Sequence, residues 1–126
     1  MVSIPGPSAL TAALSVAGIP QDQFFFAGFL PRQPNSLRKR LHELSDLGVP
    51  IVVFEAPYRI GRTLEVIVET WGPATRVVLA HELTKMFEEV VDTSAQELLT
   101  HPLVLHARGE YVLILTPAPP RLLKRA

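Results

Sequence analysis

Three short runs of apolar residues constrain the fold of this chain most strongly. They are PIVVFEA (residues 50–56), TRVVLAHEL (75–83) and GEYVLILTP (109–117), and β-branched residues are frequent in them. Such short, nearly continuous apolar runs are typical of strands buried on both faces. The run QFFFAGFL (23–30) predicts another buried strand, whereas the more polar FEEVVDTS (87–94) predicts an edge strand.

Helical patterns alternate with these strands. Residues 36–47, capped by Asn35 and stopped by Gly48, and residues 59–71, ended by Gly72 and Pro73, each place apolar side chains along one stripe. Shorter helices are predicted at residues 8–17, after a cap at Ser8, and after Ser94, where Glu97 stands at the capping-box position. This alternation predicts an α/β domain with three α/β/α layers around a mixed sheet of about five strands.

Bulk composition supports a single soluble domain. The chain has 126 residues, of which 48% are apolar, and contains no cysteine. No uninterrupted apolar run approaches the length of about 18 residues that a membrane-spanning helix needs. We therefore expect a globular domain over residues 1–116, a Pro-rich and then basic tail over 117–126, no membrane association, and a location compatible with the reducing cytoplasm.

The formal net charge of zero hides an uneven distribution. Residues 32–62 contain six cations and three acids, and Arg38, Lys39 and Arg40 fall in the early turns of a predicted helix. Because the helix dipole disfavours cations there, one interpretation is a surface that binds an anion such as phosphate. The other is a solvated face on which Glu43 and Asp46 offset the positive charges.

Two polar motifs follow predicted buried strands, where α/β proteins place ligands. In FEAPYR (54–59), Glu55 is a candidate ligand-facing carboxylate and Arg59 a cation at a helix start, although an ion pair between them would equally order the loop. In HELTKMFEE (81–89), His81, Glu82, Thr84 and Lys85 offer groups for acid–base or hydrogen-bonding work. The remaining histidines lack metal-ligand spacing, so we expect no metal.

Five segments in order resemble the tetrapyrrole (corrin/porphyrin) methylase superfamily. They are IPGPSAL, FFFAGFLPR, FEAPYR, ELTKMFEE and GEYVLIL, which extend from Val2 to about Leu115. Within the superfamily they are most similar to the small-subunit ribosomal RNA 2′-O-ribose cytidine methyltransferases. Members have two domains with S-adenosylmethionine in the cleft between them, and the segment like PGPSA begins the second domain. The resemblance thus implies that this chain is the second domain and lacks the N-terminal one.

The resemblance also implies roles for individual residues. Those implied to line the cofactor are Pro5, Gly6, Ser8, Ala9, Glu55, Ala56 and Leu83. Arg32 and Arg59 are similar to presumed substrate-facing cations, as is Lys85. Glu82 and Lys85 are the candidates in this chain for a catalytic proton acceptor or orienting group.

The implied activity is 2′-O-methylation of small-subunit ribosomal RNA. Because one cofactor wall would be missing, we expect little or no activity from the chain alone. We also expect an exposed apolar patch and a homodimer. Two alternatives stay open: a methylase of the same superfamily acting on a tetrapyrrole or another small molecule, and a non-catalytic binding or dimerisation module.

Overall fold

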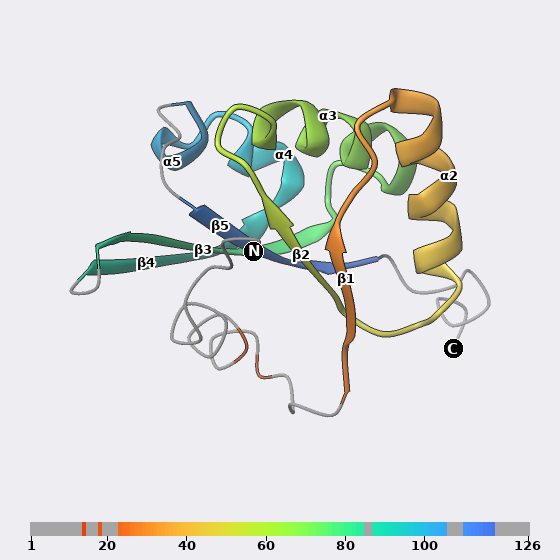
Figure 1. Ribbon diagram of the computed structural model, residues 1–126, viewed down its shortest axis with the longest axis horizontal. Coiled ribbons are helices and arrows are strands. Elements are labelled where there is room, and N and C mark those ends of the chain that lie inside the picture. Colours follow the sequence, from red (N-terminus) through yellow and green to blue (C-terminus); the bar gives the residue numbers. More distant parts are fainter. Residues whose placement is uncertain (1–13, 15–17, 19–22, 85–86, 106–109, 118–126) are drawn as a thin grey trace, which may run out of the picture.

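A computed structural model describes residues 14, 18, 23–84, 87–105 and 110–117. They form a five-stranded mixed sheet with helices packed on it, which confirms the predicted α/β class (Figure 1). The elements in chain order are β1 (Phe25–Phe29), α2 (Pro34–Ser45), β2 (Ile51–Glu55), α3 (Ile60–Trp71), β3 (Arg76–Thr84), β4 (Phe87–Ser94), α4 (Ala95–Leu98), α5 (Pro102–Leu105) and β5 (Glu110–Thr116).

The strand order β1-β2-β5-β3-β4 places β5, the last strand in the sequence, at the centre. β1 and β2 are parallel, whereas β5 is antiparallel to both β2 and β3. Strands β1, β2 and β3 therefore run in the same direction, and their carboxyl ends reach the same edge of the sheet. We call this the strand-end edge.

The four helices α2 to α5 cover one face of the sheet (Figure 1). Leu37, Leu41 and Leu44, the predicted stripe of α2, are buried there. The α2 and α3 helices are also tied together directly, because the Trp71 indole Nε1 donates a hydrogen bond to the Leu41 carbonyl at 3.1 Å. This helix-covered face contains the larger of two hydrophobic clusters.

The second face of the sheet is also apolar. Its buried side chains come from alternate positions of the central strands and are Val52, Phe54, Val78, Ala80, Val112 and Ile114. Together with Leu14, which is helical, they form a separate hydrophobic cluster. The rest of the helix predicted at residues 8–17 lies outside the described residues. Burial on both faces explains why the central parts of β2, β3 and β5 are apolar in sequence. No helix in the described part of the chain has the length and apolar character needed to cross a membrane.

The prediction that the first strand is buried on both faces is wrong. β1 lies at the edge of the sheet, and the Phe26 and Phe29 side chains are 51% and 52% exposed. The register shifts between Phe26 and Gly28, and Gly28 has a φ of 72°. This bulge places both phenylalanines on the second face, where their rings contact Phe54 edge-on at centroid distances of 5.2 and 5.8 Å. Three aromatic residues in a row thus mark a bulged edge strand.

Helix ends agree with the sequence in part. Ser94 caps α4, since its hydroxyl accepts the Glu97 backbone N–H at 3.2 Å, and β4 is an edge strand, as predicted. The predicted cap at Asn35 is wrong: α2 begins at Pro34, and Asn35 instead accepts a hydrogen bond from Arg38 at 3.0 Å. Proline is favoured in the first turn because its missing N–H needs no partner there. The short helix α5 was not predicted.

Candidate functional site

The strand-end edge brings together loops that are far apart in sequence. The loop after β1 contains Pro31 and Arg32, and the turn after β2 contains residues 56–59. The Arg59 guanidinium Nη2 donates a hydrogen bond to the Pro31 carbonyl at 3.1 Å, which joins these two loops. Two motifs identified from the sequence are therefore neighbours in space.

Glu55 is the last residue of β2 and is only 3% exposed. Its carboxylate accepts hydrogen bonds from the Ala56 backbone N–H at 3.0 Å and from the Thr63 hydroxyl of α3 at 2.6 Å. Arg59 Nη1 lies 3.9 Å from the same carboxylate. Buried charges require such partners. These contacts support the loop-ordering interpretation of Glu55, and its contact with a cofactor stays a prediction.

Arg59 stands at the start of α3, as the sequence predicted, but its side chain is only 18% exposed. One guanidinium nitrogen donates a hydrogen bond to the Pro31 carbonyl, and another forms an ion pair with Glu55. The residue therefore holds the two loops together. The neighbouring cations Arg32 and Arg62 are exposed, and neither forms an ion pair within the described residues.

The basic turns of α2 are largely neutralised. Arg38 forms an ion pair with Glu69 of α3 at 3.1 Å, and Arg40 pairs with Glu43 at 3.4 Å. The Arg40 guanidinium also lies over the Phe25 ring, 5.9 Å from its centroid. For these two cations the interpretation as a solvated, charge-balanced face is the better one. Lys39 is exposed.

His81, near the end of β3, is the least expected feature of this edge. It is 2% exposed and stacks on Tyr111 of β5 with the ring centroids 4.3 Å apart. Tyr111 is opposite both His81 and Glu55 in register, so the three form one cross-strand row on the helix-covered face. Neither His81 ring nitrogen has a hydrogen-bond partner among the described residues. The sequence showed His81 in a polar motif but could not show its burial.

Several predicted site residues lie beyond what can be placed. Pro5, Gly6, Ser8, Ala9 and Lys85 are outside the described residues. Glu82 and Leu83 belong to β3, and Glu82 is opposite Glu88 of β4 and Glu110 of β5 in register. The catalytic roles of Glu82 and Lys85 and the cofactor contact of Leu83 stay predictions. No group of metal-ligating side chains is found in the described ranges.

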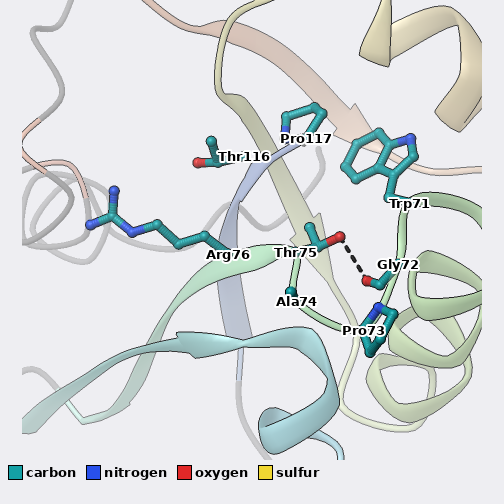
Figure 2. Close-up of a pocket in the computed structure, with 8 residues that line it drawn as sticks. All are labelled: Trp71, Gly72, Pro73, Ala74, Thr75, Arg76, Thr116 and Pro117. Carbon is teal, nitrogen blue, oxygen red and sulfur yellow. Dashed lines mark hydrogen bonds between the residues drawn. The ribbon is translucent and has the colours of Figure 1, made fainter. Parts of the chain in front are cut away.

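A cavity of about 350 Å³ lies at the opposite edge of the sheet, near the start of β3 and the end of β5 (Figure 2). Trp71 and Pro117 contribute to its wall, and the Thr75 hydroxyl donates to the Gly72 carbonyl at 2.8 Å. Arg76, which also lines it, donates two hydrogen bonds to Asp92, at 3.0 and 2.7 Å. These bonds raise the pKa of Arg76 and lower that of Asp92. None of the predicted site residues lines this cavity.

Comparison with known proteins identifies the family. The model of the family Tetrapyrrole (Corrin/Porphyrin) Methylases matches residues 1–99. The chain belongs to this family. It is 40% identical over 117 residues to a Xylella fastidiosa (strain 9a5c) protein named Ribosomal RNA small subunit methyltransferase I, covering 91% of this chain and 43% of that protein. A Neisseria meningitidis serogroup B protein of the same name is 42% identical over 123 residues, covering 94% and 41%.

Two solved structures share this fold. The chain is similar to the methyltransferase CobJ, with a TM-score of 0.61 and 19% identity over 86% of this chain and 47% of that one. It is also similar to a diphthine synthase, with a TM-score of 0.60 and 11% identity, covering 91% and 48%. The chain therefore spans about two fifths of the curated relatives it matches and about half of these structures.

Proposed function

We propose that this chain is the second domain of an S-adenosylmethionine-dependent methyltransferase that acts on the ribose 2′-hydroxyl of a cytidine in small-subunit ribosomal RNA. The main support is its 40% identity to a relative named Ribosomal RNA small subunit methyltransferase I. The geometry is compatible with this role, because the motifs after β1 and β2 meet at one edge with Arg32 exposed. A ribosomal substrate would place the protein in the cytoplasm.

The positions of two implied cofactor contacts support the strand-end edge as the cofactor site. The implied contacts Ala56 and Leu83 lie at the ends of β2 and β3, which are separated only by β5. At about 4.8 Å per strand, these positions are roughly 10 Å apart across the sheet, a span that one nucleoside-containing ligand can bridge. Pro5, Gly6, Ser8 and Ala9 would complete this wall.

S-adenosylmethionine held at this edge would supply an electrophilic methyl group. A C–O bond to the ribose 2′-oxygen would form as the C–S bond of the sulfonium breaks, which would leave S-adenosylhomocysteine. The ribose hydroxyl is a poor nucleophile at neutral pH, so the protein must position it and accept its proton. Glu82 and Lys85 are the groups in this chain proposed for that work. Arg32 and Arg59 are proposed to act toward the substrate, Arg59 by fixing the loop that contains Arg32.

We propose that the chain alone has little or no activity, because it matches only about two fifths of its curated relatives and the cofactor cleft needs a second wall. We also propose a homodimer. β1 is an edge strand with two half-exposed phenylalanines, and such apolar edges favour association. Light scattering at high protein concentration tests the dimer, and a monomer there would contradict it.

The decisive experiment joins binding and chemistry. S-adenosylhomocysteine is titrated calorimetrically into the chain alone and into its mixture with the first domain of the same enzyme. The mixture is then incubated with labelled S-adenosylmethionine and unmodified small-subunit ribosomal RNA. Because 2′-O-methylation removes the nucleophile of alkaline cleavage, label in an alkali-resistant dinucleotide identifies the product. Label only in alkali-labile nucleotides, or none in the mixture, would contradict the proposal.

A further inference from the structure

Tyr58 is the most exposed large apolar side chain in the described part of the chain, at 77%. It lies in the tight turn between β2 and α3, where the Arg59 backbone N–H donates to the Ala56 carbonyl at 3.0 Å. The neighbours of this turn are anchored: Glu55 is buried on one side and Ile60 on the other. The turn thus presents a large aromatic ring to solvent from a well-ordered base.

Two exposed arginines lie in the segments next to this turn. Arg62 is in the first turn of α3, four residues after Tyr58, and Arg32 is in the adjacent loop, which the bond from Arg59 to Pro31 holds against the turn. The segments 30–34 and 56–62 contain no acidic residue. Whereas Arg38, Arg40 and Arg76 are paired with carboxylates, Arg32 and Arg62 form no ion pair within the described ranges. This part of the edge is therefore positively charged, although the chain is neutral overall.

We propose that Tyr58, Arg32 and Arg62 form a binding site for single-stranded RNA, in which the Tyr58 ring stacks on an unpaired base and the arginines contact its flanking phosphates. This inference rests on the proposed function and names the surface that function would use. An exposed aromatic ring with cations that form no ion pair on the neighbouring segments matches the chemistry of single-strand recognition, because bases stack on aromatic faces while cations neutralise phosphates. Arg59 is a positioning residue here.

A protein partner is the less favoured occupant of this surface. Protein interfaces typically bury an apolar centre with few charges, and the fully apolar exposed pair, Phe26 and Phe29, belongs to β1. Tyr58 instead belongs to a turn whose segment, residues 56–62, contains two arginines and no acidic residue. An RNA strand satisfies both the ring and the charges.

The test measures binding of the full 126-residue chain to a fluorescent 12-nucleotide oligocytidylate at several salt concentrations. Tyr58→Ala should weaken binding about 5- to 150-fold, the range expected for one lost base–aromatic stack, whereas Tyr58→Phe should bind like wild type. Arg32→Gln and Arg62→Gln should each reduce the slope of log K against log salt by about 0.7. Leu47→Ala and Arg76→Gln, which alter an exposed apolar residue and a cation at the opposite edge, are the matched controls.

Binding of Tyr58→Ala within twofold of wild type, or no RNA binding by wild type at low salt, would overturn the inference. So would a Tyr58→Ala variant that binds RNA normally but no longer associates with the first domain, since Tyr58 would then contact protein. Circular dichroism checks that each variant folds. Binding needs no methyl donor, so Tyr58-dependent binding without an alkali-resistant product would refute the proposed function and leave this inference standing.

Discussion

Replacing His81 by phenylalanine should stabilise the protein. The imidazole is 2% exposed, and neither nitrogen has a hydrogen-bond partner among the described residues. Each unsatisfied buried donor or acceptor costs about 1–3 kcal/mol, so a ring with one of each costs roughly 2–6 kcal/mol. A phenyl ring keeps the stack on Tyr111 but is slightly larger, and overpacking subtracts about 1–3 kcal/mol. The middle of each range, about 4 and about 2 kcal/mol, gives an expected net gain in unfolding free energy of about 2 kcal/mol.

Urea unfolding followed by circular dichroism measures this gain. The midpoint should rise for His81→Phe while the slope m stays unchanged, because the same surface is exposed on unfolding. His81→Leu removes both nitrogens and the stacked ring, so it should be less stable than His81→Phe by about 0.5–1.5 kcal/mol. His42→Phe changes an exposed histidine of α2 and should shift stability by no more than about 0.5 kcal/mol.

A fall in unfolding free energy for His81→Phe, with His42→Phe unchanged, would refute the reasoning. It would mean that the imidazole has a partner outside the described residues whose loss exceeds the relief of desolvation. If the variant is more stable but transfers methyl groups more slowly in the complete enzyme, His81 lowers the stability of the fold and is needed for activity. Stability and activity measured on the same variant separate these cases.

Three further changes test other contacts. Thr63→Val removes the hydroxyl that donates to buried Glu55 at 2.6 Å and should lower the unfolding free energy by about 1.5–3 kcal/mol in urea titrations; an unchanged midpoint would contradict the bond. Asp92→Asn should cost only about 0.2–1 kcal/mol at pH 7, because the pair with Arg76 is partly exposed. Since folding lowers the Asp92 pKa, that difference should begin to shrink as the pH falls below about 4 and should vanish only below the pKa of the folded state; a difference that does not shrink would refute the assignment. Ser94→Ala should cost about 1 kcal/mol in urea titrations through its lost helix cap.

The buried strands and the two long helices were predictable because local pattern and tertiary environment agree there. In β2 the apolar residues 51–54 are all buried, as their run predicts, and Leu37, Leu41 and Leu44 face the sheet as their spacing predicts. The capping box at Ser94 involves contacts over three residues only, so the sequence contains the whole interaction. Each of these features is decided within one element.

Two features that the sequence did not reveal are decided between elements. QFFFAGFL is as apolar as a central strand. Its sequence does not indicate, however, that β5 lies at the centre of the sheet and β1 at its edge. The burial of His81 similarly depends on Tyr111, which lies 30 residues later in the sequence and is opposite it in register. A local pattern does not contain such pairings.

In the motif FEAPYR, some residues fix the position of the turn, whereas a neighbouring residue is exposed and available for contact with RNA. Glu55 and Arg59 both form hydrogen bonds within this chain. Glu55 accepts from Ala56 and Thr63, and Arg59 donates to the Pro31 carbonyl. Because these contacts set the position of the turn, replacing either residue would displace Tyr58 and Arg32 together. A loss of RNA binding in an Arg59 variant would therefore not identify Arg59 as a contact. Only the exposed side chains, Tyr58, Arg32 and Arg62, can report contact directly, since their replacement leaves the supporting bonds intact.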